Sequence, residues 1–216
     1  MQGETRPKKQ GPRRAKKQVW VCIASGPSLT QEDVEAVKDQ NVIAVNDNWR
    51  WIRNWKSPAR RVVYACDPHW WNHWIGDVVD SGVDADLWTQ SQQAAGRYNL
   101  NHIKSAAKAN LAARDSGVIH QGRNSGFQSV GLAYHFGATH ILLLGYDMQK
   151  TGDKRHWFGD HPKSMDRKSP YELFVKAFES IDVPDLEIIN CSRDTALGCF
   201  PRMTIEEALC TLTRSN

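Results

Sequence analysis

The sequence predicts an α/β fold, with a Rossmann-like, mainly parallel sheet and helices on both faces. Short, wholly apolar runs alternate with segments of helical pattern, which indicates strands that are buried on both faces. Polar or turn residues follow directly after several of these runs. With 216 residues and a hydrophobic content of 40%, we expect one domain, over residues 19–216, with a sizeable core.

The first predicted strand, residues 19–24, stops at Ser25-Gly26-Pro27-Ser28. Thr30 and Asp33 then form a capping-box pattern, which predicts a helix to about Gln40. A strand, a tight turn and a helix start in such close succession aim free N–H groups and the positive end of a helix dipole at one point. The turn therefore suits an anion such as the phosphate of a nucleotide.

The remaining elements follow the same alternation along the chain. Further strands are expected at 42–45, 61–66, 85–90, 140–144 and 186–190. Helices are expected at 49–55, 68–74, 102–114, 124–136 and 170–181, and after a second capping box at 204–207. Pro68 suits a first helical turn, and Gly137 suits a helix C-cap. Residues 148–169, charged and rich in His, Gly and Asp, predict a mobile active-site loop or lid.

The net charge of +4 is unevenly distributed along the chain. Residues 1–18 carry seven Lys or Arg residues and one acid, a net charge of +6, which leaves −2 for the remainder. With almost no apolar residues, this basic segment is expected to be a disordered tail. It can contact nucleic acid or an anionic surface, or it can serve only as a solubilising leader.

Five cysteines, an odd number without close repeated spacing, give no disulfide framework. Cys22, Cys66 and Cys191 lie in or at the end of apolar runs, where a reduced, buried thiol is the default. No apolar run is long enough for a membrane span or a signal peptide. We therefore expect a cytoplasmic protein.

Ligands of parallel sheets bind beyond the carboxyl ends of the strands. The residues that follow the predicted strands, and those that open the helix after residue 124, should therefore converge on one edge. These candidate binding residues are Ser25, Gly26, Pro27, Ser28, Asn46, Asp47, Asp67, Asn124, Ser125, Gly126, Tyr146, Asn190, Cys191 and Ser192.

The candidate catalytic residues are Asp147, His156 and His161. Asp147 follows a buried strand of aliphatic residues, where a carboxylate either acts in the site or caps the next turn. Histidine titrates near working pH, so either histidine can act as a base, or both can be exposed bystanders. No residue is assigned as a metal ligand, although His69 and His73 lie four apart on one helix.

Six tryptophans, at positions 49, 51, 55, 70, 71 and 74, form a further cluster in the sequence. Their rings can stack on a base or a sugar, or they can pack helices against the sheet. The packing role is the more frequent one for residues of this kind.

Several short motifs, in order along residues 19–201, carry a resemblance to a known family. They are Gly-Pro-Ser-Leu at 26–29, Val-Asn-Asp at 45–47, Ser-Gly at 125–126, Gly-Tyr-Asp at 145–147 and Asn-Cys-Ser at 190–192, followed by Thr195-Ala196-Leu197 and Phe200-Pro201. Together they resemble bacterial lipooligosaccharide α-2,3-sialyltransferases. The Gly-Pro-Ser-Leu layout is also similar to 6-hydroxymethylpterin pyrophosphokinase-like proteins and to phage-encoded relatives.

The sialyltransferase resemblance implies a cytidine nucleotide-sugar donor and inverting sugar transfer that requires no metal cofactor. It implies that 26–28 shape the phosphate turn and that Ser125 and Gly126 open a donor-facing helix. It also places Asn46 and Asp67 near the nucleotide, and 190–192 against base and ribose. The segment 156–161 resembles the one that holds the family's catalytic base, with one extra residue between the histidines. The base is therefore His161 or His156.

Two alternatives from other classes stay open. A pyrophosphokinase-like enzyme would use Mg²⁺ held by Asp147 and by Asp47 or Asp67. A non-catalytic nucleotide- or DNA-binding module is suggested only by the basic tail. The sequence contains no P-loop, and it leaves the acceptor and the oligomeric state open.

Overall fold

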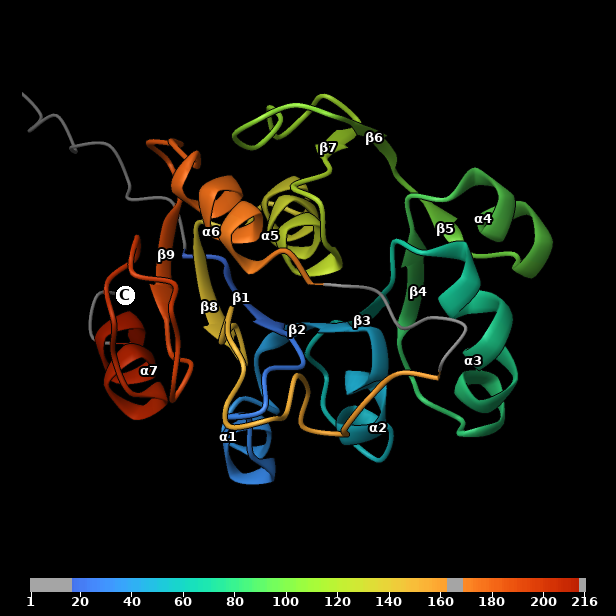
Figure 1. Cartoon of the computed structure of the whole chain (residues 1–216), viewed down its shortest axis with the longest axis horizontal. Helices are drawn as coiled ribbons and strands as arrows, with labels where there is room; N and C mark the ends of the chain where they lie inside the picture. The colour runs from blue at the N-terminus through green and yellow to red at the C-terminus, as the bar shows by residue number, and fades with distance from the viewer. Residues whose placement is uncertain (1–16, 163–168, 214–216) are drawn as a thin grey trace, which may run out of the picture.

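The structure is a computed structural model that describes residues 17–162 and 169–213. Its centre is a seven-stranded sheet in the order β5-β4-β3-β2-β1-β8-β9, in which each pair of neighbours is parallel (Figure 1). The strands are β1 (Val19–Ile23), β2 (Asn41–Val45), β3 (Arg61–Tyr64), β4 (Asp86–Thr89), β5 (Asn101–His102), β8 (His140–Leu144) and β9 (Glu187–Asn190). A separate parallel pair consists of β6 (Lys104–Ala106) and β7 (Val118–His120).

Helices cover both faces of the sheet, and Figure 1 shows α5 and α6 on the side opposite α1, α2 and α7. The helices are α1 (Gln31–Glu35), α2 (Trp49–Ile52), α3 (Pro68–Asp80), α4 (Gln92–Tyr98), α5 (Ser125–His135), α6 (Tyr171–Glu179) and α7 (Ile205–Thr213). A short 3₁₀ helix, η1 (Asn46–Asn48), precedes α2. The predicted fold class, an α/β Rossmann-like fold, is confirmed.

The two faces explain why the strands are apolar without alternation. Along β1, Val21 and Ile23 belong to the core under α1, α2, α3 and α7, whereas Trp20 and Cys22 belong to the core under α5 and α6. Successive side chains of a strand point to opposite faces, so a strand covered on both sides needs apolar residues at every position. The same division applies to β8, whose residues 141–144 are fully buried.

The prediction of a helix at 102–114 is wrong. His102 and Ile103 extend the sheet edge, with the Ile103 N–H donating to the Thr89 carbonyl at 3.0 Å. Asn110 has a positive φ of 60°, and its N–H donates to Ser180 Oγ in a distant segment. Tertiary contacts therefore override local helical propensity here. The helix of this region is α4, capped by Ser91 and ended by the left-handed Asn99.

Helix boundaries elsewhere differ from the prediction in length. α1 ends at Glu35. Turns closed by hydrogen bonds between residues three apart continue to Gln40, whose N–H donates to the Val37 carbonyl. α3 extends to Asp80, beyond the predicted end at 74. Both predicted capping boxes are present, at Thr30 and at Thr204, each with reciprocal hydrogen bonds. Gly137 follows the C-cap of α5 with a φ of 95°.

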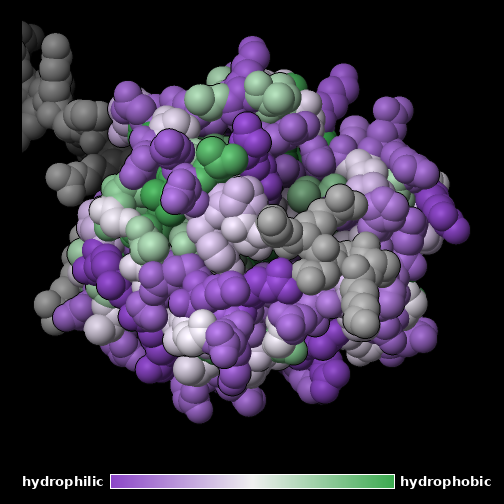
Figure 2. Space-filling model, in the orientation of Figure 1, coloured by the Kyte–Doolittle hydropathy of each residue, from purple (hydrophilic) through white to green (hydrophobic). Residues whose placement is uncertain are grey.

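The predicted basic tail lies almost wholly outside the described residues. Gln18, at its end, is bound to the fold, because its carbonyl accepts from the backbone N–H groups of Thr139 and His140. Among the described helices, none is long and apolar enough to cross a membrane. The face shown in Figure 2 is largely hydrophilic, with hydrophobic side chains gathered near α6, where Leu173 is 40% exposed.

The carboxyl ends of β1 and β8 approach each other through two glycines. The Gly26 N–H donates to the Gly145 carbonyl at 2.8 Å. A Cβ on Gly26 would lie 2.1 Å from Asp147 Oδ1 and 2.6 Å from the Gly145 carbonyl oxygen. Gly145 itself has a φ of 69°, and a Cβ there would lie 2.5 Å from the Ala24 carbonyl oxygen. Neither position can carry a side chain without moving a strand end.

Replacing Gly26 by Ala is expected to destabilise the fold by about 1–3 kcal/mol, because the added methyl overlaps backbone that cannot move aside. The free energy of unfolding, measured by chemical denaturation, checks this. Gly76→Ala in α3 is the control, since its Cβ meets nothing within 4 Å and should stabilise the helix by up to about 1 kcal/mol. Equal effects of the two substitutions would contradict the close approach described above.

Candidate functional site

A cavity of about 130 Å³ lies at the carboxyl ends of β1, β2 and β8. Its walls come from these strand ends, from the first turn of α5, from the segment around His156 and from the start of α6. The lining residues are Ala24, Ser25, Gly26, Val45, Asn46, Asn124, Ser125, Gly126, Gly145, Asp147, Met148, Gln149, Arg155, His156, Ser169, Tyr171 and Phe174. The cavity thus occupies the position at which parallel sheets bind their ligands.

The structure brings eight of the predicted site residues together in this wall. They are Ser25, Gly26, Asn46, Asn124, Ser125, Gly126, Asp147 and His156. Their segments are far apart in the sequence and converge because parallel strands end at the same edge. Asn46 adopts a left-handed conformation, with a φ of 52°, where the chain turns from β2 into η1.

The N-terminus of α5 is fixed by side chains on both sides. Asn124 is its N-cap, and its Oδ1 accepts from the Phe127 N–H at 2.7 Å. Ser125 Oγ accepts from the Cys66 N–H at 3.1 Å, which holds the helix start against the end of β3. Gly126 is tightly packed, because a Cβ would lie 3.0 Å from Asn124 Oδ1 and 3.2 Å from the Tyr146 ring, so that one of them would have to shift slightly. The positive end of an eleven-residue helix therefore borders the cavity.

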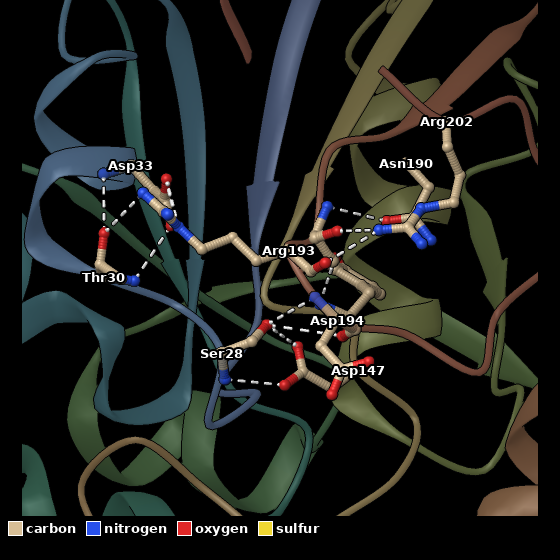
Figure 3. A network of polar contacts seen from close by, with 10 residues as sticks. Ser28, Thr30, Asp33, Asp147, Asn190, Arg193, Asp194 and Arg202 are labelled. Carbon is tan, nitrogen blue, oxygen red and sulfur yellow. Dashed lines mark hydrogen bonds and ion pairs between the residues drawn. The ribbon is translucent and has the colours of Figure 1, made fainter. Parts of the chain in front are cut away.

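Asp147 ties the β1 turn to the end of β8 (Figure 3). Its two carboxylate oxygens accept from the Ser28 N–H and the Ser28 hydroxyl, both at 2.8 Å. The Asp194 N–H in turn donates to Ser28 Oγ at 3.3 Å, which links the segment after β9. Asp147 is 1% exposed although it contributes to the cavity wall. Its contacts are those of a residue that positions the turn at 25–28.

Burial raises the pKa of the Asp147 carboxyl above its usual value, although hydrogen bonds from the Ser28 N–H and hydroxyl lower it and the charge of Asp194 raises it. For a carboxyl with a raised pKa, the ionised form is less favourable in the folded state than in the unfolded chain. Asp147 therefore contributes most to the free energy of unfolding at pH values below the pKa of its carboxyl in the unfolded chain. This contribution is lost as the pH rises through the pKa of the same carboxyl in the folded state. At neutral pH the charge of Asp147 costs stability, whereas its hydrogen bonds add to it.

His156 and His161 occupy different positions relative to the cavity. His156 lines it, whereas His161 is not among the lining residues, and the centroids of the two rings lie 4.7 Å apart. The His156 ring also stacks on Phe158, with centroids 5.0 Å apart. Burial lowers the pKa of His156 to about 4, and the charges of His161 and Arg155 act in the same direction. His156 is thus a neutral imidazole at neutral pH.

The segment after β9 is buried beside the site, and it does not line the cavity. Asn190 Oδ1 accepts from the Ser192 N–H, and its amide donates to the Leu197 carbonyl. Ser192 Oγ accepts from the Tyr146 N–H at 2.8 Å. Cys191 is buried, and burial raises the pKa of its thiol to about 12. These residues hold the end of β8 in place.

Tyr146 and Pro27 also lie outside the cavity wall. The Tyr146 side chain is fully buried behind α5, where its hydroxyl donates to the Gly126 carbonyl and contacts Ser129 Oγ at 2.8 Å. Pro27 precedes Ser28 in the turn that Asp147 holds.

The two other strand-end aspartates have structural partners. Asp47 is buried and accepts from the Trp70 indole at 3.0 Å, and it pairs with Arg50 at 3.0 Å. Asp67 is the N-cap of α3 and accepts from the His69 N–H. Within residues 17–162 and 169–213, no group of three or more His, Cys, Asp or Glu residues is placed to hold a metal. The arrangement lends no support to the pyrophosphokinase alternative.

The tryptophan cluster is mainly part of the core. Trp49, Trp55, Trp70 and Trp71 are at most 8% exposed and pack beneath the sheet. Trp51 and Trp74 are partly buried against the same core. The packing interpretation therefore holds for most of the cluster, and Trp51 alone stacks on a residue of the loop after β8, Trp157.

The sequence did not single out Met148, Gln149, Ser169 and Phe174 as site residues. Phe174 could have been found, because Tyr171, Phe174 and Phe178 recur at helical spacing and give α6 an apolar face. Tyr171 and Arg155 also line the cavity. Met148 has a φ of 51°, which turns the chain back along the cavity, and no sequence signal marks this turn.

No protein-family model matches the sequence, and no curated protein sequence matches it. Solved structures with a similar fold include the sialyltransferase CstII from Campylobacter jejuni, in complex with the substrate analogue cytidine-5'-monophosphate. It shares 10% identity over 88% of this chain and 86% of that one, with a TM-score of 0.57. The monofunctional α-2,3-sialyltransferase Cst-I from Campylobacter jejuni shares 10% identity, with coverages of 91% and 84% and a TM-score of 0.56.

A MAf glycosyltransferase from Magnetospirillum magneticum AMB-1 is also similar, with 12% identity and a TM-score of 0.54. The match covers 94% of this chain and spans 38% of the length of that protein. At these identities the comparisons establish the fold, which is of the Rossmann-like glycosyltransferase type. They lend no support to the pyrophosphokinase-like or phage relationships.

Removal of the Asp147 side chain tests its positioning role. Asp147→Ala is expected to lower the free energy of unfolding by about 1–3 kcal/mol, because the Ser28 N–H loses its acceptor. Asp147→Asn should cost less, since an amide oxygen still accepts and the buried charge is gone. Chemical denaturation of both variants, with Asp153→Ala in an exposed loop position as control, checks the order. A loss for Asp147→Asn as large as for Asp147→Ala would show that the charge itself stabilises the turn.

The lowered pKa of His156 predicts a pH dependence of stability. The unfolded chain takes up a proton near pH 6.5, whereas the folded state resists it until about pH 4. Stability from this residue is therefore full above pH 6.5 and is lost as pH falls toward 4. His156→Asn should flatten the dependence, whereas His73→Asn, at an exposed position on α3, should not. Burial also lowers the pKa of His140, but His140 is present in the unmodified chain and in both variants, so its contribution is the same in each. An NMR titration showing His156 protonated at pH 6 would contradict this prediction.

Proposed function

We propose that this protein is an inverting glycosyltransferase that moves a sugar from a nucleotide-sugar donor to an acceptor hydroxyl. The observation that carries the proposal is one cavity lined by a histidine, His156, by the N-terminus of α5 and by an arginine, Arg155. A neutral imidazole can accept the hydroxyl proton, and the positive groups can stabilise a leaving phosphate. The fold shared with sialyltransferases and a second glycosyltransferase supports the same class of reaction.

The donor phosphate would lie at the α5 N-terminus, which offers a fixed partial positive charge. Arg155 also lines the cavity, and its guanidinium donates to Asp160 Oδ1 at 3.0 Å. Tyr171 also contributes to the wall, where its buried hydroxyl makes no hydrogen bond of normal geometry within residues 17–162 and 169–213 and has Ser169 as a polar neighbour. A phosphate oxygen beside this hydroxyl would give it a well-formed hydrogen bond, which is typically worth about 0.5–1.5 kcal/mol.

In the proposed step, His156 removes the proton from the acceptor hydroxyl as its oxygen attacks the anomeric carbon. The bond between that carbon and the phosphate oxygen breaks, and the electron pair leaves with the nucleotide phosphate. Attack from the opposite face inverts the anomeric centre. In this proposal His156 is the base because it lines the cavity, and His161 is the residue whose ring contacts it.

The cavity is smaller than the roughly 300–1,000 Å³ of common small-molecule sites, so a whole nucleotide-sugar needs more room. The walls that can give way are those from Arg155 and His156, since the strand ends are fixed by Asp147 and the two glycines. The proposal therefore includes a shift of this segment when the donor binds, in line with the predicted mobility of the loop at 148–169.

The resemblance and the cytidine-5'-monophosphate in the CstII structure favour a cytidine nucleotide as donor. A thermal-shift screen against CMP, UDP, GDP and ADP sugars and ATP, with and without Mg²⁺, tests this choice. A ligand at about one hundred times its dissociation constant stabilises by about 2.7 kcal/mol, which such a screen detects. Stabilisation by ATP with Mg²⁺ alone would overturn the proposal. We expect transfer without a metal cofactor, so EDTA should leave it unchanged.

Turnover of the donor found in this screen separates the two histidines. His156→Asn should lower kcat by about 10²–10⁴-fold with little change in KM, because only the proton acceptor is lost. His161→Asn should have a much smaller effect. Tyr171→Phe should raise the donor KM by removing one hydroxyl from the phosphate site. If His161→Asn proves the more damaging substitution, the assignment of the base is wrong.

A further inference from the structure

A second, larger recess of about 590 Å³ lies between α1 and α2, beside the cavity described above. Its lining residues are Gln31, Glu35, Lys38, Arg50, Trp51, Arg53, Asn54, Trp55, Lys56, Ser57 and Trp157. Its size is within the range of small-molecule binding sites. In Figure 2 the surface over α1 and α2 is mostly hydrophilic.

The recess carries an excess of positive charge. Four cationic side chains line it against one acid, Glu35, and one of the four, Arg50, is paired with Asp47 outside the lining. That acid is already engaged, because its Oε1 accepts from the Trp55 indole at 3.0 Å and its Oε2 lies 4.0 Å from Lys38 Nζ. Arg53 and Lys56 are exposed and have no acidic partner in the part of the chain that the structure describes. Both can therefore bind an anion without first breaking an ion pair.

Aromatic rings and amides complete the lining. Trp51 and Trp157 pack on each other with centroids 4.5 Å apart and both reach the recess. Gln31, Asn54 and Ser57 add neutral donors and acceptors. Arginine pairs with a carboxylate or phosphate through two parallel hydrogen bonds, while tryptophan covers an apolar ring face. This combination matches a sugar ring that carries an acidic group.

Trp157 connects the recess to the catalytic cavity. Its N–H donates to the Ser25 carbonyl at 3.2 Å, in the phosphate turn, and its indole donates to Asn48 Oδ1 at 2.8 Å. Asn48 also donates to Ser25 Oγ at 3.0 Å. The residue before Trp157 is His156, which lines the cavity. The two hollows thus lie on either side of one short segment.

We propose that this recess binds an acidic carbohydrate, the charged part of the glycosyl acceptor, beside the donor cavity. The role of this sugar as a glycosyl acceptor rests on the proposed function. The binding of an acidic sugar rests on the recess alone. A single-stranded nucleic acid fits less well. Trp55 is only 8% exposed, and the Trp51 and Trp157 rings contact each other at an interplanar angle of 55°, so the recess does not offer a row of separate ring faces on which successive bases could stack.

Calorimetric titration with cellobiouronic acid and with cellobiose tests the proposal on the full chain. The two disaccharides differ by one carboxylate. We expect the acidic sugar to bind at least about tenfold more tightly than the neutral one. The double variant Arg53→Glu, Lys56→Glu should lose that preference. Arg97→Glu, Lys104→Glu is the control, because both residues are exposed and neither lines the recess.

Three results would overturn the proposal. The first is equal binding of both sugars, or of neither, by the unmodified chain. The second is an equal loss in the control variant, which would indicate a general charge effect. The third is competition from another ligand class. Displacement of the acidic sugar by an equal concentration of inorganic phosphate would assign the recess to simple anions. Tighter binding of an oligothymidine that depends on Arg53 and Lys56 would assign it to nucleic acid.

The same titrations distinguish this proposal from the proposed function. The Arg53→Glu, Lys56→Glu variant should bind CMP as the unmodified chain does, because neither residue lines the donor cavity. If CMP fails to bind while the acidic sugar binds in the recess, the donor assignment fails and the recess stands. If CMP binds but the acidic sugar does not, the donor assignment stands and the recess inference fails.

Discussion

The close contact between the ends of β1 and β8 determines how the rest of the site is built. Gly26 and Gly145 face each other without side chains, so that the Gly26 N–H reaches the Gly145 carbonyl and the Asp147 carboxylate reaches Ser28. This contact fixes the direction in which the turn after β1 leaves the sheet. The same network extends through Asp194 to the segment after β9, where Arg193 pairs with Asp33 of α1 at 2.8 Å (Figure 3).

The polar residues at the strand ends divide into two groups because of this constraint. Asp47, Tyr146, Asn190 and Ser192 satisfy buried backbone or indole groups, and their hydrogen-bonding capacity is used within the fold. Buried polar groups must find partners, so a polar residue after a buried strand often serves the strand end itself. The proposed chemistry therefore rests on residues of the loop and of α5 and α6, which complete the wall of the cavity.

The strands and the edge at which the site lies could be predicted because parallel, doubly covered strands leave a plain apolar signature. Such a signature is absent from residues 101–120. The conformation of this segment depends on hydrogen bonds between Asn110 and Ser180, which is distant in sequence, and between His120 and the Asn110 carbonyl across the loop. The choice between His156 and His161 could not be made from spacing, because it depends on which ring faces the cavity. Asp147 was found by its position, but only the structure shows that its oxygens are occupied by Ser28.

The position of Trp157 gives the loop a second function beyond carrying His156. Its backbone bonds to the phosphate turn, and its ring forms part of the basic recess, so a change at either side moves the same short segment. Under the function proposed above, a donor that displaces Arg155 and His156 would also shift Trp157 in the wall of the recess, and a ligand in the recess would act on the same segment from the other side. Such coupling is reciprocal in binding free energy. For a transferase with two substrates, the short segment 155–157 would thus be the physical link between the two binding events.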